Sequence, residues 1–389
     1  MRILLVSTQD YIHHPVPSRH HYIFEELATR HEVHVPHFHV SEGRERTTRL
    51  IVHEATKYPA KNPAIHYTLN APHHYKVFKR IIAEEDIDVV VAAHVLSGTA
   101  VIKAAKKRNV PVLFDLKDWF PDSAAAYYDN RLIKWALRSG IWSVVRYNLK
   151  NSDKITTVSP SLVERLDRLG FRSELITNGV NTDYFKPMDP AEGKRRLGLD
   201  EDTFVMGFCG SMEKWYALDE VIKKFAEFLD QEEDSRLLFV GGSLFTGYEE
   251  ELKGLAKKLG IGDKVIFTGL VEYRELPSYI SAMDLCLIPF SPSPDYWVDI
   301  VLPNKFFEYS ACGKPILSYP IPDVMKIGGE HLFIYQDMDE FLDKVREVKS
   351  GRREFKVDME NYSWKKKAEE MERVLYELKR RGDRQVEVR

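Results

Sequence analysis

The sequence has little of what several classes of protein require. It contains only three cysteines in 389 residues, Cys209, Cys286 and Cys312, and their spacing fits neither a metal-binding pair nor a redox motif. No apolar run approaches the roughly 20 residues of a membrane-spanning helix, and the first residues lack the pattern of a secretion signal. We therefore expect a cytoplasmic protein without disulfide bonds.

An excess of charge of one sign is also missing. The 56 Lys and Arg residues nearly balance the 59 Asp and Glu residues, for a net charge of -3. Such a chain has no general basic field, so nucleic acid is not expected as a partner. No candidate strand is followed by G-x-G-x-x-G, which argues against a nicotinamide-dependent dehydrogenase.

What the chain does contain is a regular alternation of short apolar runs with longer amphipathic segments. This alternation is typical of parallel α/β sheets that are buried on both faces. Six candidate strands occur in each half, which predicts two doubly wound, Rossmann-like domains facing a cleft. A segment with prolines, glycines and mixed charge separates them near Pro187. The predicted domains are residues 1–186 and 187–362, followed over residues 363–389 by a helix that packs back toward the first domain.

The stretch LPNKFFEYSACGKPI, residues 302–316, predicts a short helix from Pro303 to Cys312, closed by a glycine in the left-handed conformation. Because this helix follows a strand, its free N–H groups and positive dipole end form an anion site. Lys305 adds a cation in the first turn, and Glu308 on the same face could accept hydrogen bonds from ribose hydroxyls. A nucleotide diphosphate fits these groups, and an ordinary surface salt bridge is the alternative.

This stretch resembles the nucleotide-sugar-binding segment of the GT-B glycosyltransferases, in particular the large retaining group called family four. The resemblance continues through VSPSLVERLDRLGF, ITNGVNTDYFKP, GFCGSMEKWYALDEVI and VIFTGLVEYRELPSYISAMDLCLIPF, and it covers the chain from about Lys154 to its end. It implies a first domain that binds a hydroxyl acceptor and a second that binds a nucleotide-diphosphate sugar. It also implies transfer without a metal ion, and no cofactor is expected.

The resemblance places the donor on loops that follow strands of the second domain. The implied contacts are Gly210, Ser211, Gly241, Gly269, Val271, Glu272, Asn304, Lys305 and Glu308. Lys214 and Lys305 would neutralise the leaving diphosphate, although Lys214 could equally be a solvated surface charge. Ile300 stands where the family has a glutamate that touches the donor sugar, and the adjacent Asp299 could substitute for it. Retention is implied by the resemblance, and inversion stays open.

In the first domain, FDLKDWFPD resembles the family's segment that reaches toward the reacting sugar. Lys117 stands where the family has a histidine, and Asp118 could deprotonate an acceptor hydroxyl or, alternatively, cap the next helix. Further candidate substrate contacts are His13, Arg19 and His20 after the first strand, and His94 at another strand end. His94 could equally be a structural histidine.

Histidine is concentrated near the start of the chain, with twelve of the fourteen before residue 75. They occur as adjacent pairs and as the trio His34, His37 and His39, which alternates along a strand. Neither arrangement has the spacing of a metal site, so none is predicted.

Residues 130–150 predict an amphipathic helix with five Arg and Lys residues. Packing on the sheet is the simpler interpretation, and contact with an anionic membrane surface, which suits a lipid-linked acceptor, is the alternative. Two other functions stay open: a sugar-nucleotide epimerase of similar shape, and a noncatalytic hinge protein that binds a sugar.

Overall fold

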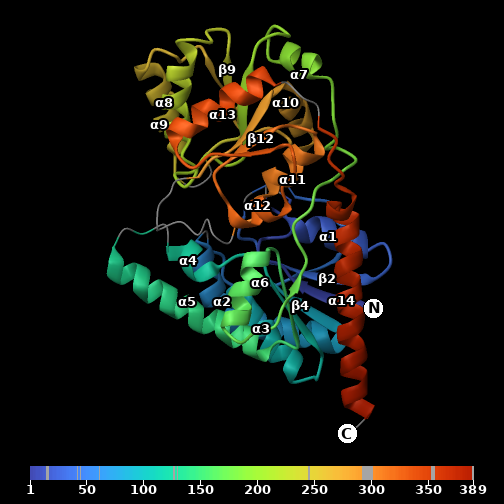
Figure 1. Ribbon diagram of the computed structural model, residues 1–389. Helices are drawn as coiled ribbons and strands as arrows, with labels where there is room; N and C mark the ends of the chain where they lie inside the picture. Colours follow the sequence, from blue (N-terminus) through green and yellow to red (C-terminus); the bar gives the residue numbers. More distant parts are fainter. Residues whose placement is uncertain are drawn as a thin grey trace. The chain divides into compact units, whose positions relative to one another are not determined.

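The computed structural model describes residues 1–14, 17–41, 43, 45–60, 62–125, 128, 130–243, 246–290, 301–351 and 355–387. Over these residues the chain forms two compact units, each built on a parallel sheet (Figure 1). Unit 1 comprises Met1–Asn178 and Trp364–Arg389, and unit 2 comprises Gly179–Ser363. The units divide between Asn178 and Gly179, whereas the sequence had suggested a boundary near Pro187.

Unit 1 contains, in its described residues, a seven-stranded sheet in the order β3-β2-β1-β4-β5-β6-β7. The strands are β1 (Arg2–Val6), β2 (Glu32–His37), β3 (Ile51–Glu54), β4 (Val89–Ala92), β5 (Val112–Leu116), β6 (Lys154–Thr157) and β7 (Glu174–Leu175). The strand order reverses between β1 and β4, which is where ligands of such sheets bind, beyond the carboxyl ends of the strands. The short edge strand β3 was not predicted, because most of its side chains are exposed and it lacks a continuous apolar run.

The helices of unit 1 connect these strands, and one of them comes from the far end of the sequence. They are α1 (Arg19–Leu27), α2 (Pro63–Glu84), α3 (Val95–Lys106), α4 (Phe120–Ala125), α5 (Arg131–Asn151), α6 (Pro160–Arg168) and α14 (Trp364–Glu387). Figure 1 shows α14 running alongside α1, and its buried residues share one hydrophobic cluster with those of α1 and β1.

Unit 2 contains, in its described residues, a six-stranded parallel sheet in the order β10-β9-β8-β11-β12-β13. The strands are β8 (Val205–Cys209), β9 (Arg236–Val240), β10 (Val265–Phe267), β11 (Leu285–Ile288), β12 (Ile316–Ser318) and β13 (Leu332–Ile334). The helices are α7 (Pro190–Arg196), α8 (Leu218–Leu229), α9 (Tyr248–Lys258), η1 (Tyr273–Glu275), α10 (Leu276–Ala282), α11 (Asn304–Ala311), α12 (Pro322–Ile327), α13 (Met338–Ser350) and η3 (Glu360–Tyr362). All six strands predicted for this half are confirmed.

Alternate residues of the unit 2 strands enter two separate hydrophobic clusters. Met206 and Phe208 of β8 pack with α8, α9 and α13, whereas Val205 and Cys209 of the same strand pack with α10, α11 and α12. Because side chains alternate across a strand, both faces of the sheet are covered by helices. This explains why the strands appear in the sequence as continuous apolar runs, and it confirms the predicted pair of doubly wound sheets.

Helix α14 is held on unit 1 by an apolar stripe and by charged side chains at its borders. Trp364, Ala368, Met371, Leu375 and Leu378 are buried at spacings of three and four residues, which is one face of a helix. Asp88 accepts a hydrogen bond of 2.7 Å from the Lys379 ammonium. The last helix of the chain is therefore part of the core of unit 1.

We expect Leu375→Ala to lower the free energy of unfolding by about 2–5 kcal/mol, because Leu375 is fully buried and its removal leaves a cavity. Urea unfolding followed by circular dichroism measures the change. Lys365→Ala, on the exposed face of the same helix, is the matched control and should change stability by less than about 0.5 kcal/mol. Equal effects of the two substitutions would contradict the packing of α14.

Candidate functional site

Three loops that contain glycine meet at the carboxyl ends of β8, β9 and β10 in unit 2. Gly210, Gly241 and Gly269 have positive φ angles of 136°, 123° and 68°, which glycine adopts without strain. The backbone N–H of Gly241 donates to the Gly269 carbonyl at 3.1 Å, and that of Gly210 donates to the Val240 carbonyl at 2.9 Å. A Cβ atom on Gly241 would overlap the Gly210 carbonyl oxygen. The three predicted glycines therefore form one continuous backbone surface.

Helix α11 presents an uncapped N-terminus. Its N-cap is Pro303, in extended conformation, and no side chain of the described residues caps this end. At the other end Gly313 has a φ of 67°, and the N–H of Lys314 donates to the Tyr309 carbonyl at 3.1 Å. The predicted helix is confirmed, but Pro303 is its N-cap and Asn304 is its first residue. Its first turn keeps N–H groups available for an anion.

The Lys305 ammonium lies inside unit 2 and next to the first glycine loop. Its residue is 7% exposed, and Nζ lies 3.8 Å from the ring centre of Tyr216 and 4.6 Å from that of Phe208. A Cβ atom on Gly210 would lie 3.5 Å from Nζ, so the ammonium stands beside the backbone of that loop. The aromatic rings hold the cation without neutralising it. This burial excludes the alternative of a surface salt bridge.

Glu308 lies one turn further along α11 and is also buried. The Tyr273 hydroxyl donates to Glu308 Oε1 at 3.0 Å. Burial raises the pKa of Glu308, and the hydrogen bond from Tyr273 and the charge of Lys305 only partly offset this effect. A carboxyl group kept in such a place at a cost in stability is typical of a functional role.

Lys214 and Ser211 have partners away from Lys305. The Lys214 ammonium lies 3.0 Å from Glu251 Oε1 on α9, and its side chain is 52% exposed. The Ser211 hydroxyl donates to the buried Glu213 at 2.8 Å, which leaves the backbone of Ser211 as its means of contact with a ligand. The role of Lys214 at the diphosphate stays a prediction.

The remaining predicted donor contacts lie at the starts of helices or outside the described residues. Glu272 is the N-cap of η1, and Val271 packs against the apolar cluster that contains α11. Asn304 is exposed in the first turn of α11. Asp299 lies outside the described residues.

In unit 1, Arg19 has no hydrogen-bond partner among the described residues although it is 3% exposed. Its closest charged neighbour is Asp115, with Nη1 3.7 Å from Oδ1. Burial alone would raise the pKa of Asp115, but Arg19 and hydrogen bonds from His20 and Thr156 hold it well below its usual value. Asp115, which the sequence did not single out, thus compensates the Arg19 charge while the guanidinium donors stay available.

His20, a predicted substrate contact, has a partner at each ring nitrogen. One ring nitrogen lies 3.0 Å from Ser7 Oγ and the other 2.9 Å from Asp115 Oδ2, so both are already bonded inside unit 1. Burial lowers the pKa of His20, and the bond to Asp115 opposes this effect. The bond to Asp115 gives His20 a structural role, and its contact with substrate stays a prediction.

His94 is the N-cap of α3, at the carboxyl end of β4. Its Nδ1 accepts hydrogen bonds from the N–H groups of Leu96 and Ser97 at 3.2 and 3.1 Å. Burial lowers the pKa of His94 to about 3, so the ring is neutral and carries its proton on Nε2. His94 therefore caps α3, and Nε2–H is left as a donor at the switch point of the sheet, so its contact with substrate stays a prediction.

His13 and Asp118 occupy two other loops of unit 1. His13 Nδ1 lies 2.8 Å from His37 Nε2, so its nearest partner is another histidine. Asp118 accepts hydrogen bonds from the Trp119 N–H and from the Ser123 hydroxyl at the start of α4, as a capping residue would. Burial raises the pKa of Asp118, and Lys117 beside it partly offsets this effect. Its role as a base stays a prediction.

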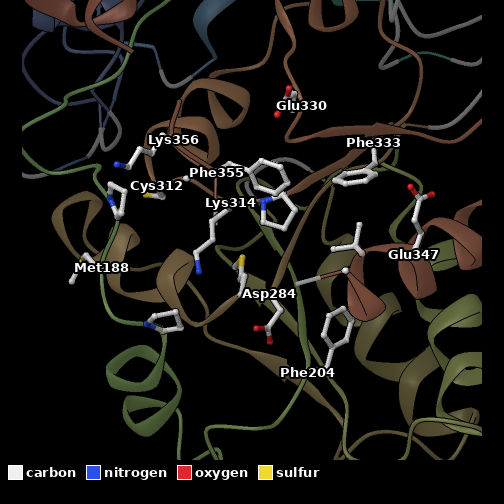
Figure 2. Close-up of a pocket in the computed structure, with 17 residues that line it drawn as sticks. Met188, Phe204, Asp284, Cys312, Lys314, Glu330, Phe333, Glu347, Phe355 and Lys356 are labelled. Carbon is white, nitrogen blue, oxygen red and sulfur yellow. The ribbon is translucent and has the colours of Figure 1, made fainter. Parts of the chain in front are cut away.

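A cavity of about 500 Å³ lies at the opposite, amino ends of the unit 2 strands (Figure 2). Phe204, Asp284 and Pro315, which line it, directly precede β8, β11 and β12. The Lys314 ammonium donates to the Ser281 carbonyl at 2.7 Å. This cavity is therefore distinct from the glycine loops, which lie at the carboxyl ends of the same strands, where parallel sheets commonly bind ligands.

Helix α5 combines a packed end with an exposed end. Val145, Asn148 and Leu149 are buried, whereas Leu132 and Trp135 are 77% and 69% exposed. Among the described residues, no helix is both long and apolar enough to cross a membrane.

Comparison with known families agrees with this geometry. Residues 20–184 match the family described as Glycosyltransferase Family 4, and residues 203–350 match the family described as Glycosyl transferases group 1. The first match lies in both unit 1 and the start of unit 2, and the second lies wholly within unit 2.

Curated relatives match over part of their length. The chain is 32% identical over 163 residues to the D-inositol 3-phosphate glycosyltransferase of Frankia alni, a match covering 40% of this chain and 38% of the relative. It is 27% identical over 204 residues to the putative teichuronic acid biosynthesis glycosyltransferase TuaH of Bacillus subtilis, covering 51% and 48%. These matches thus span half or less of each relative.

Solved structures match over nearly the whole chain. The sucrose-phosphate synthase of Thermosynechococcus elongatus has a TM-score of 0.79 at 18% identity, with coverage of 97% of this chain and 98% of that one. The Anabaena protein HepE in complex with UDP-glucose has a TM-score of 0.68 at 16% identity, with coverage of 97% and 100%. The fold is therefore that of the GT-B glycosyltransferases. The two family matches together cover most of the sequence, with a Glycosyltransferase Family 4 domain over residues 20–184 and a Glycosyl transferases group 1 domain over residues 203–350.

We expect Gly241→Ala to weaken nucleotide binding at least tenfold, because its Cβ would overlap the Gly210 carbonyl and its φ is strained for alanine. The matched control is Gly254→Ala in α9, where a Cβ meets no atom within 4 Å. That change should leave binding intact and raise stability by about 0.5–1 kcal/mol. Calorimetric titration with nucleotide and urea unfolding test both statements, and unchanged affinity in Gly241→Ala would contradict the assigned surface.

Proposed function

We propose that the protein transfers a sugar from a nucleoside-diphosphate donor to a hydroxyl group of an acceptor. Unit 2 would hold the donor and unit 1 the acceptor. The observation that carries the proposal is the buried Lys305 ammonium between the uncapped end of α11 and the Gly210 loop. Two phosphate groups supply the negative charge that this arrangement lacks.

The other groups of unit 2 fit the remaining parts of a nucleotide sugar. Glu308, fixed by Tyr273, would accept hydrogen bonds from the ribose hydroxyls. The backbone around Gly269, Val271 and Glu272 would contact the base. The complexes of HepE with UDP, UDP-glucose, and UDP and glucose support a donor of this kind by similarity of fold.

In the proposed reaction, the bond between the anomeric carbon and the diphosphate oxygen breaks, and its electron pair stays on the diphosphate. Lys305 and the α11 N–H groups stabilise that charge, with Lys214 as a second proposed cation. The acceptor oxygen bonds to the anomeric carbon, and its proton passes to the departing phosphate oxygen if the configuration is retained. If it is inverted, Asp118 is the proposed base.

No metal ion is needed for this step, because protein cations and helix N–H groups take the place of a divalent ion at the diphosphate. Arg19 is the proposed contact for an anionic group of the acceptor, since its guanidinium donors have no partner in the described residues. Seven of the matched relatives are named D-inositol 3-phosphate glycosyltransferase, and the compound in that name combines hydroxyl groups with a phosphate. The exposed Leu132 and Trp135 near basic residues of α5 support a further proposal, peripheral contact with an anionic membrane.

We expect Lys305→Met to weaken binding of the preferred nucleotide at least tenfold, which is about 1.4 kcal/mol. A thermal-shift screen of UDP, GDP and ADP first identifies that nucleotide, because a ligand of the folded state raises its stability. Lys314→Met is the matched control, since Lys314 is an equally buried lysine at the amino ends of the same sheet. The proposal is contradicted if the two variants bind the nucleotide equally well.

We expect release of the nucleoside diphosphate from the donor to depend on a hydroxyl acceptor and to continue in EDTA. Acceptors are supplied with and without a phosphate group, and the phosphorylated ones should react faster because of Arg19. Consumption of donor without any acceptor would indicate an epimerase, and binding without consumption would indicate a sugar-binding hinge protein. A strict requirement for a divalent ion would count against the metal-free step.

A further inference from the structure

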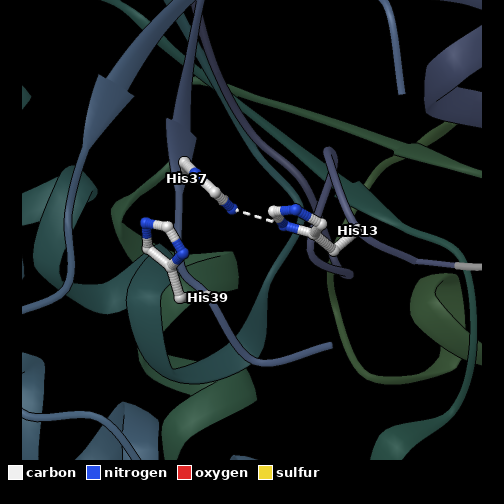
Figure 3. Close-up of side chains that lie close together, drawn as sticks. All are labelled: His13, His37 and His39. Atoms are coloured by element: carbon white, nitrogen blue, oxygen red, sulfur yellow. Dashed lines mark hydrogen bonds between the residues drawn. The ribbon is translucent and has the colours of Figure 1, made fainter. Parts of the chain in front are cut away.

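The fold brings three histidines of unit 1 together in space (Figure 3). His13 comes from the loop after β1, His37 ends β2, and His39 follows it by two residues. One ring nitrogen of each lies within 4.8 Å of those of the other two. The ring centres of His37 and His39 are 3.5 Å apart, and those of His13 and His37 are 4.8 Å apart. We call these three residues the histidine cluster.

A carboxylate on the neighbouring strand determines which nitrogen of His37 is available. Glu54 of β3 lies with Oε1 3.3 Å from His37 Nδ1 and with Oε2 2.6 Å from His39 Nε2. A carboxylate only accepts, so it favours the proton on His37 Nδ1 and leaves the lone pair on Nε2, which faces His13. Histidines that bind metals are commonly oriented by a carboxylate in this way.

A second carboxylate holds the segments of the cluster in place. Asp10 Oδ1 accepts from the N–H groups of Ile12 and His13, and Oδ2 accepts from those of Val40 and Ser41, at 2.9 to 3.2 Å. These bonds tie the loop after β1 to the chain after β2. His39 itself has a φ of 49°, which is uncommon for a side chain other than glycine. The cluster is therefore built by the fold rather than by free surface side chains.

Charge and access also suit a cation. The carboxylates of Asp10 and Glu54 supply two negative charges, which a divalent ion would balance. The His39 side chain is 44% exposed and gives an entry path from solvent. His66, fully buried nearby, has no hydrogen bond to either ring nitrogen within the described part of the chain.

We propose that His13, His37 and His39 bind a divalent zinc ion in unit 1. Imidazole nitrogen is a preferred ligand of zinc and a poor one for magnesium, which selects the metal. Nitrogens around a tetrahedral zinc are about 3.3 Å apart, and the present 2.8 Å between His13 and His37 needs only a small outward movement. The ion fastens the loop after β1 to β2 and takes no part in the sugar transfer.

Another group, His34, His53 and Glu85, also has ligand atoms within 4.8 Å of one another. It offers two imidazoles instead of three, and His34 Nε2 is bonded to Glu32 at 3.1 Å. Zinc prefers the larger number of nitrogens, so the histidine cluster should be occupied first. The second group supplies the control for the experiment.

The test uses the full chain, treated with EDTA and then dialysed, and titrated with ZnCl₂ in competition with a chromophoric chelator. We expect one zinc ion per chain, no competition from Mg²⁺, and visible absorption bands when Co²⁺ replaces Zn²⁺. His39→Gln and, separately, His13→Gln should weaken zinc binding at least tenfold, whereas His53→Gln should leave it unchanged. His39 is exposed, so its variant is expected to fold, and circular dichroism verifies this.

Three results would overturn the proposal. The first is the absence of saturable zinc binding by the parent chain. The second is unchanged zinc affinity in the folded His39→Gln variant, which would show that the exposed ligand is not used. The third is loss of zinc binding in His53→Gln, which would place the ion at the other group.

Discussion

The arrangement of unit 2 depends on a buried cation, the Lys305 ammonium, which lies beside backbone and has no ion pair among the described residues. The Lys305 ammonium lies over two aromatic rings and beside Gly210, where the nearest atoms compensate its charge only weakly. Burying a charge without an ionic partner costs free energy, and a bound anion would offset that cost. The open first turn of α11 adds partial positive charge to the same place. The neighbouring groups can be understood as supports for this one interaction.

The glycine loops contribute because residues without side chains let the backbone lie close to the Lys305 ammonium. At Gly241 even one methyl group would overlap the carbonyl of Gly210, so the two loops touch through backbone alone. Tyr216 shields the ammonium from water and packs against Phe290, with ring centres 4.8 Å apart. A low local dielectric strengthens the attraction between the ammonium and an anion. The glycine backbone, the Tyr216 ring and the Lys305 ammonium would therefore all favour an anion at this place.

Much of this was predictable from the sequence, for identifiable reasons. Strands covered on both faces appear as unbroken apolar runs, so all six strands of unit 2 were found, whereas the exposed edge strand β3 was not. The glycines and the ends of α11 were found because few residues tolerate those backbone conformations. Tyr216 and Tyr273 were missed because a tyrosine that positions a charge has the same appearance in a sequence as one that fills a core.

Contacts made across the sheet of unit 1 could not be predicted, because they depend on strand order. The loop after β1 and the end of β2 are adjacent only because these strands pair in parallel. His13 thus meets His37, 24 positions away, and Asp115 meets His20, 95 positions away. A search of the sequence for functional side chains three or four residues apart detects neither of these two pairs. The carboxylate of Asp115, inside an otherwise apolar strand, was the available signal.

The position of α14 has a consequence for how the molecule is made. Unit 1 is assembled from two separate stretches of chain, with the whole of unit 2 inserted between them. During synthesis, unit 2 is therefore complete before α14 of unit 1 has been made. Until then, the apolar residues of unit 1 that pack against Trp364 and Leu375 are exposed. Unit 1 is therefore complete only after α14, residues Trp364–Glu387, has been synthesised.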